Sequence, residues 1–234
     1  MLTVYECALL SEAAYSGSSQ RQILSRGFRA HSQRGEGRGF FGRAFSRRGI
    51  VVVAFAGTDD LQDAWDNVEF ARRIPEDQAT QAEAYFSNIV RRIESGDTIF
   101  VVTGHSLGGG LAKHVLLQND AVDAAVAFNA PCVGGLEGVN RSMGTLLNVN
   151  SRGDWVSGVT RAIGKFEIGE TLVQEIQPFQ RPRLRRLIAG GIGGAGAMAE
   201  EALSQAEERL GHQHSIGALR AALAAGELGR RTVP

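Results

Sequence analysis

The chain has 234 residues, of which 43% are hydrophobic and 21% charged, and its 25 basic and 25 acidic side chains balance to a formal net charge of zero. This length and composition predict one globular domain over residues 1–234 with a sizeable core. The sequence has no run of the roughly 18 to 20 apolar residues that are needed to cross a bilayer. Its first residues also lack the basic segment followed by an apolar one that marks a classical signal peptide. We therefore expect a protein that is cytoplasmic or exported by a non-classical route.

The apolar pattern predicts alternating helices and short strands, beginning with a helix at residues 5–16 and an irregular segment to about residue 38. The later strands have apolar cores, which suits a sheet covered by helices on both faces. The fold class is therefore α/β, with a mostly parallel central sheet. Strands are expected at 40–45, 50–56, 98–103, 124–128 and 146–150, with an edge strand at 166–170, and helices at 61–70, 78–95, 107–119, 200–210 and 216–225.

A Gly-x-Ser-x-Gly motif centred on Ser106 lies between the apolar run 99–103 and the helical run 111–117. That context is a strand, a tight turn and a helix. A serine at such a turn is lifted clear of the backbone, and the flanking glycines are needed because side chains there would collide with the crossing strand and helix. The motif predicts that Ser106 is an accessible nucleophile.

A serine nucleophile needs a base, and the base needs a carboxylate that orients it and stabilises its protonated form. Asp154 follows the buried-looking strand 146–150 at its carboxyl end, which is the edge of a parallel sheet where a site is expected. Asp120 and Asp123 lie instead in a turn expected at the opposite edge. Asp154 is therefore the candidate acid.

Three histidines follow Ser106 in the chain and are candidates for the base. His114 lies two turns into the following helix and points away from the corner, which indicates a structural role. His212 and His214 lie two residues apart between two helical stretches. The spacing of the residues alone leaves both of them open.

Several separate motifs resemble the class 3 (fungal-lipase-like) branch of the α/β-hydrolases, which includes bacterial lipase and phospholipase A1 relatives. The segment 51–58 resembles the family's strand that ends in F-R-G-[ST], and 102–110 resembles its nucleophile motif. The segments 150–156 and 214–216 resemble its acid and base motifs, and 7–15 resembles the helix that opens many members. Ala56 replaces the family's usual arginine, and Trp155 and Ser157 stand where the family often has prolines. None of these departures removes a catalytic group.

The resemblance implies the α/β-hydrolase fold and favours His214 over His212 as the base, because the neighbours of His214 fit the base motif. It also implies an oxyanion hole formed by the backbone N–H groups of Thr58 and Leu107. Donors placed in advance around the developing oxyanion are worth about 3 kcal/mol each in the transition state. The Thr58 hydroxyl would add a third donor.

We therefore predict a serine hydrolase of carboxylic esters in which Ser106 attacks, His214 acts as base and then as acid, and Asp154 orients it. The resemblance implies lipid esters as substrates, with a lipase of the triacylglycerol-lipase type as the first reading. A phospholipase A1 acting on membrane phospholipids, including a bacterial effector, is the alternative. A second alternative is a non-catalytic α/β-hydrolase scaffold, against which the intact set of three groups argues. The triad chemistry also remains compatible with a peptidase or a thioesterase.

No metal and no cofactor are expected, because the sequence has neither a ligand cluster outside the triad nor a glycine fingerprint for a nucleotide. Eight arginines crowd residues 21–48 against Glu36 alone, and four more lie in 181–186. They form either a site for anionic lipid head groups or phosphate, with peripheral membrane contact, or a solvated face. Nucleic acid is disfavoured because no nucleic-acid fold signature accompanies them. The glycine-rich segment 188–199 is either a mobile cover or a loose connection, and the oligomeric state is not predicted.

Overall fold

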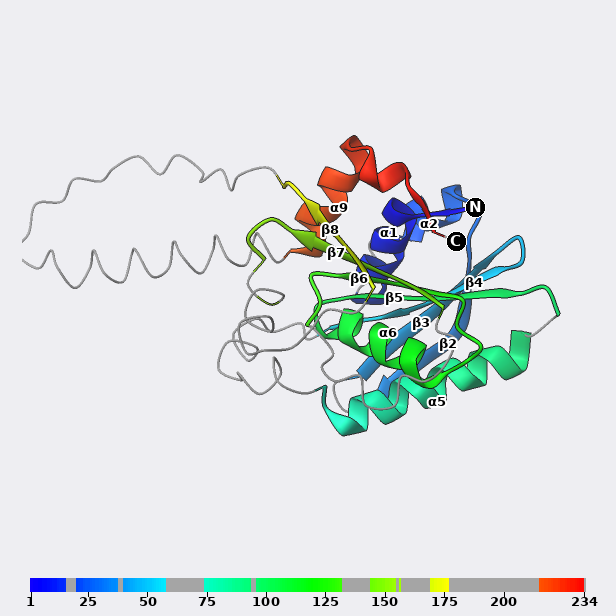
Figure 1. Ribbon diagram of the computed structural model, residues 1–234. Helices are drawn as coiled ribbons and strands as arrows, with labels where there is room; N and C mark the ends of the chain where they lie inside the picture. Colours follow the sequence, from blue (N-terminus) through cyan, green and yellow to red (C-terminus); the bar gives the residue numbers. More distant parts are fainter. Residues whose placement is uncertain are drawn as a thin grey trace, which may run out of the picture.

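The computed structural model describes residues 1–15, 20–37, 40–57, 74–93, 96–131, 144–154, 156, 169–176 and 215–233. Within these ranges a seven-stranded sheet has the strand order β2-β3-β4-β5-β6-β7-β8 (Figure 1). The two chain ends meet beside it, where β1 (Leu2–Thr3) pairs antiparallel with β9 (Thr232–Val233). The expected α/β class is confirmed.

Five consecutive strands of the large sheet are parallel, so all their carboxyl ends lie at one edge, which we call the carboxyl edge. Except in the polar edge strand β8, most of their residues are buried and apolar, as expected for parallel strands covered by helices on both faces. This edge is where open α/β sheets bind their ligands. The strands are β4 (Ile50–Phe55), β5 (Ile99–His105), β6 (Ala124–Phe128), β7 (Thr145–Ser151) and β8 (Glu170–Gln174).

The remaining two strands, β2 (Arg29–Gly37) and β3 (Phe40–Arg47), extend the sheet in antiparallel fashion. The expected irregular segment to residue 38 is therefore wrong, because it contains β2 and the short helix α2 (Gln20–Ser25). The sequence of β2 is polar and glycine-rich, without an alternating apolar pattern. Its place in the sheet depends on backbone pairing with β3, which local periodicity does not reveal.

Helices cover the sheet on both faces (Figure 1). On one face, α1 (Val4–Tyr15) and α9 (Ile216–Ala225) pack in a core that includes Leu9, Phe128 and Leu219. On the other face, α5 (Glu76–Ile93) and α6 (Leu107–Gln118) form a second core with the opposite side of the same strands. His114 on α6 pairs with Glu83 on α5 at 2.6 Å, which confirms its structural role. No helix in the described ranges is long and apolar enough to span a membrane.

An edge strand is present beside β7 at Glu170–Gln174, with Leu147 opposite Glu170. Of the range 166–170 expected for it, residues 166–168 lie outside the described residues. Gly169 precedes the strand with φ +84°, and a Cβ atom there would lie 2.5 Å from the Leu146 carbonyl oxygen. The helices expected at 61–70 and 200–210, and the segment 188–199, lie outside the described residues.

A buried carboxylate ties the beginning of the chain to the sheet. Both Glu6 oxygens accept hydrogen bonds from Arg47 at 2.6 and 2.9 Å, and Glu6 Oε2 also accepts one from the Thr3 N–H at 3.0 Å. Burial by itself raises the pKa of the Glu6 carboxyl, but the bonds from Arg47 and Thr3, with the charges of Arg47 and Arg26, outweigh it. The net effect is a pKa below the ordinary value of 4.5.

We expect Glu6 to make the stability of the fold fall in acid. Because its pKa is lower in the folded than in the unfolded chain, its carboxylate stabilises the fold above about pH 4.5. That contribution is lost as the pH falls through the folded-state pKa. In urea unfolding at pH 7 and below pH 4, Glu6→Gln should be destabilised at pH 7 and should approach the parent protein in acid. The exposed Glu227→Gln serves as control, and an equal pH dependence in both variants would contradict the assignment.

Candidate active site

Ser106 occupies the corner between β5 and α6 with φ +57° and ψ −130°. A residue other than glycine in such a conformation costs about 1–3 kcal/mol, and it persists only where the surroundings hold it. Here the Ser106 N–H donates to Phe128 O on β6 at 2.9 Å, and Ser106 O accepts from the N–H groups of Gly109 and Gly110 at 2.9 and 3.2 Å. The half-buried side chain makes no hydrogen bond that caps α6. The hydroxyl is therefore not committed to holding the helix.

The glycines of the motif allow three backbone segments to touch at this corner. A Cβ atom at Gly104 would lie 2.2 Å from Gly108 O, and one at Gly108 would lie 2.2 Å from Phe55 O at the end of β4. A Cβ atom at Gly109 would lie 2.6 Å from the side chain of Ala130. The obstacles at Gly104 and Gly108 are backbone atoms that cannot rotate away. The expectation that side chains would collide at these positions is confirmed.

We expect Gly104→Ala to damage the corner in both stability and activity. The methyl group would force the first turn of α6 away from β5, and such overpacking costs about 1–3 kcal/mol or more. A displacement of about 1 Å at a reacting group lowers the rate by about 10²-fold. The matched control is Gly96→Ala, because a Cβ atom at Gly96 meets nothing within 4 Å. Thermal unfolding and ester hydrolysis of both variants check this, and equal behaviour of the two would contradict it.

A second backbone segment lies directly beside the corner. Gly57, two residues after β4 ends, would bring a Cβ atom to 3.2 Å from Leu107 N and 2.8 Å from His105 O. The N–H of Leu107 is the first of α6, so it belongs to the helix turn whose N–H groups have no partner within the helix and whose dipole favours negative charge. Thr58 itself lies outside the described residues. The first N–H of α6 therefore lies beside Ser106, and the chain passes close to it at Gly57.

The last residue of α1 supports the same corner. The Tyr15 hydroxyl lies 3.1 Å from His105 Nδ1 and donates to His105 O at 3.2 Å. Both contacts are satisfied together when Nδ1 carries the proton and donates to the Tyr15 oxygen. A Cβ atom at Gly57 would lie 2.6 Å from the same hydroxyl. Tyr15 thus connects α1 to the two segments that meet at Ser106.

Asp154 lies at the carboxyl edge, three residues after β7 ends. It is 5% exposed, and its N–H donates to Ser151 O at 3.0 Å. β6 separates β7 from β5, so the ends of the two strands are about 10 Å apart. Ser106 and Asp154 therefore share one edge of the sheet.

Asn129 connects these two positions and was not found from the sequence. It follows β6 directly after Phe128, has φ +45°, and is fully buried. Its Oδ1 accepts from Ser151 N at 2.7 Å and its Nδ2 donates to Ser151 Oγ at 3.2 Å. The Asn129 side chain thus joins the end of β6, where Phe128 O accepts from Ser106, to Ser151, whose carbonyl oxygen accepts from Asp154. Its signal in the sequence is an asparagine, which tolerates positive φ, directly after a buried strand that lies between the two site strands.

His212 and His214 both lie outside the described residues, but the residues that follow them are placed. Ser215 caps α9, its Oγ accepting from the Ala218 N–H at 3.4 Å. Arg220 on α9 pairs with Glu12 on α1 at 3.0 Å, and a Cβ atom at Gly217 would lie 3.7 Å from the Glu12 carboxylate. The beginning of α9 therefore lies beside the end of α1, where Tyr15 contacts His105.

Within the described part of the chain, no three His, Cys, Asp or Glu side chains converge as they would to hold a metal ion. The parallel sheet, its two helical layers and the serine at a strained strand-to-helix corner define an α/β-hydrolase. Residues 3–219 match the family described as Phospholipase-like, the Tle-like phospholipase domain. The chain belongs to this family.

Among curated proteins, the extracellular phospholipase A1 of Serratia liquefaciens is 35% identical over 136 residues, which are 54% of this chain and 41% of that protein. The chain thus spans less than half of that relative's length. Among solved structures, the Lip2 lipase of Yarrowia lipolytica has a TM-score of 0.54 and 16% identity, covering 74% of this chain and 77% of that one. Lipase II of Rhizopus niveus has a TM-score of 0.58 and 15% identity, covering 73% and 80%. These likenesses confirm the resemblance to fungal lipases in fold.

Proposed function

We propose that this protein hydrolyses carboxylic esters of lipids through an acyl-enzyme on Ser106. The observation that carries the proposal is the positive-φ backbone of Ser106 at the carboxyl edge, beside the first N–H of α6. The buried Asp154 on the same edge supports it, as does the family to which the chain belongs. A scaffold without catalysis would have no physical need to hold a serine in a costly conformation.

In the proposed mechanism, His214 removes the proton from Ser106 while the serine oxygen attacks the ester carbonyl carbon. The negative charge that develops on the carbonyl oxygen is stabilised by the N–H groups of Leu107 and Thr58, with the dipole of α6 behind them. Asp154 orients the imidazole and stabilises its protonated form. His214 then donates the proton to the departing alcohol, and water hydrolyses the acyl-enzyme by the same steps.

The assignment of His214 is supported by the described residues that follow it in the chain. It precedes Ser215, and Arg220 of the helix that follows pairs with Glu12, which lies one turn before Tyr15 and its contact with His105. Ser215, the first described residue after His214, therefore lies on the face of the sheet that α1 covers. We keep His214 as the base in preference to His212.

Phospholipid is the substrate class that we favour over triacylglycerol. The family is described as phospholipase-like, and the curated relative from Serratia liquefaciens is a phospholipase A1. Of the two lipid substrates that the family resemblance implies, both findings favour phospholipid. The bond cleaved would then be the ester at the sn-1 position.

The test measures fatty-acid release from phosphatidylcholine and phosphatidylglycerol vesicles, triacylglycerol emulsions and p-nitrophenyl esters, with Ser106→Ala as the blank. A phosphatidylcholine with different acyl chains at its two positions identifies the bond that is cleaved. We expect release from phospholipid, mainly from sn-1. Release from triacylglycerol alone would overturn the substrate class, and no turnover of any ester would overturn the enzymatic function and leave the scaffold.

A further inference from the structure

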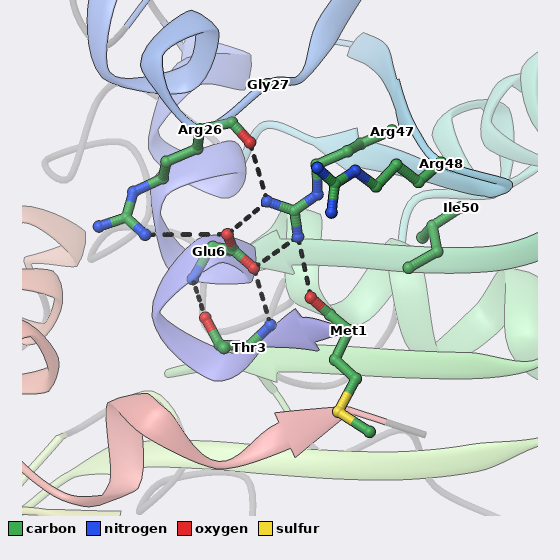
Figure 2. Close-up of a pocket in the computed structure, with 8 residues that line it drawn as sticks. All are labelled: Met1, Thr3, Glu6, Arg26, Gly27, Arg47, Arg48 and Ile50. Atoms are coloured by element: carbon green, nitrogen blue, oxygen red, sulfur yellow. Dashed lines mark hydrogen bonds and ion pairs between the residues drawn. The ribbon is translucent and has the colours of Figure 1, made fainter.

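A pocket lies far from Ser106, at the amino ends of the parallel strands (Figure 2). Its volume is about 350 Å³, within the range of about 300–1,000 Å³ usual for small-molecule sites. It lies beside Ile50, the first residue of β4, whereas the active corner lies beyond Phe55, the last, about 20 Å away at 3.3 Å per residue. The described residues that line it are Met1, Thr3, Glu6, Arg26, Gly27, Arg47, Arg48 and Ile50.

One arginine of this pocket is already neutralised. Arg47 donates to both oxygens of Glu6, and also to the carbonyl oxygens of Arg26 and Met1, each at 3.0 Å. Its guanidinium lies 4.1 Å from the ring centre of Phe28. Figure 2 shows these bonds meeting around the Glu6 carboxylate, with the side chain of Arg26 on one side of it and that of Arg48 on the other. The charges of Glu6 and Arg47 therefore cancel.

The other two arginines retain their charge. Arg26 is exposed, lies 3.7 Å from Glu6 and covers the ring of Tyr5 at 4.7 Å, so it shares a carboxylate that Arg47 already engages. Arg48 is exposed, and among the described residues no hydrogen bond or ion pair involves its guanidinium. Glu6 is the only acid among the described lining residues. With three arginines and one glutamate, the side chains of the described lining residues therefore carry a surplus of two positive charges.

The backbone of Arg48 gives independent support. Arg48 and Gly49 form the turn between β3 and β4 with φ +48° and +77°. A two-residue hairpin turn of this kind favours asparagine or glycine at the position of Arg48, and other residues are strained there. The chain nevertheless has at this position a long cationic side chain that lines the pocket. The strain is consistent with a functional use of that charge.

We propose that this pocket binds a phosphate group between Arg26 and Arg48, as a second site distinct from the catalytic one. Guanidinium groups suit phosphate because their planar N–H donors match two of its oxygens at once. The group belongs either to a phospholipid head group or to a soluble phosphate, and the two sources share the same recognition chemistry. The proposal does not depend on the proposed hydrolysis, because no residue of the pocket takes part in it.

The test uses the full chain with Ser106→Ala, so that binding is measured without turnover. Arg26→Gln with Arg48→Asn removes both surplus charges, leaves the Glu6–Arg47 pair in place and gives the turn a residue that it prefers. The control is Arg91→Gln with Arg92→Gln, which removes the same charge from the exposed end of α5. Calorimetric titration with inorganic phosphate at low salt is followed by flotation with phosphatidylcholine vesicles that contain either no or one-fifth phosphatidylglycerol.

We expect saturable phosphate binding that is at least about tenfold weaker in the pocket variant and unchanged in the control. Loss of vesicle binding in the pocket variant alone would assign the phosphate to lipid head groups, and unchanged vesicle binding would assign it to a soluble ligand. Absence of saturable phosphate binding in the parent, or equal weakening in both double variants, would overturn the site. Circular dichroism and thermal unfolding establish that both variants are folded.

Discussion

Ser106→Ala is expected to lower kcat/KM for p-nitrophenyl and phospholipid esters by at least about 10⁴-fold. The substitution removes the atom that would bond to the acyl group, and leaves only the oxyanion donors and substrate binding. Alanine keeps the Cβ atom of serine, so the strained backbone at φ +57° is as costly as before. The side chain makes no hydrogen bond that caps α6, so the stability of the fold should change little. Steady-state hydrolysis measures the expected loss of activity, and thermal unfolding tests whether the stability is unchanged.

Ser25→Ala is the matched control, because it removes an exposed hydroxyl whose hydrogen bond is to Gln22 O in α2. Its activity should equal that of the parent protein. A serine-reactive fluorophosphonate should label the parent and Ser25→Ala but not Ser106→Ala. Retained activity in Ser106→Ala would show that another residue is the nucleophile.

Asp154→Asn is expected to lower kcat by about 10⁴-fold. The amide has nearly the shape of the carboxylate but bears no charge, so it neither stabilises the imidazolium nor holds the imidazole in the tautomer that accepts the proton of Ser106. The nucleophile and the oxyanion donors remain, so covalent labelling should slow rather than disappear. Hydrolysis rates at pH 7 and the rate of labelling by fluorophosphonate measure the effect.

Asp120→Asn provides the comparison, since it makes the same change of charge in the exposed turn after α6. That turn lies at the opposite edge of the sheet, where the Asp123 N–H donates to Phe100 O at the beginning of β5. Asp120→Asn should therefore be fully active. Equal losses in the two variants would show that Asp154 has no special role at the carboxyl edge.

Most of the candidate site was accessible from the sequence because its signals are local. The strand, the serine and the helix lie within one stretch of chain. The flanking glycines are needed because backbone atoms of this stretch touch at the corner, where a Cβ atom at Gly104 would collide with Gly108 O. Asp154 was predicted because it closely follows a buried strand. The roles of Ser106, Asp154, His214, Thr58 and Leu107, the single domain over residues 1–234 and the mobile cover stay predictions.

The α/β class, the parallel strands and the serine corner could be predicted from local signals, because apolar periodicity and turn glycines reflect interactions between neighbours in the chain. The place of β2 in the sheet is visible only in the folded protein, since a polar strand is recognised through its backbone bonds to β3. It also brought Asn129 to Ser151, and Arg26 and Arg48 to one pocket around Glu6. These contacts join residues far apart in sequence. Their geometry follows from how strands and helices pack, and no local pattern encodes it.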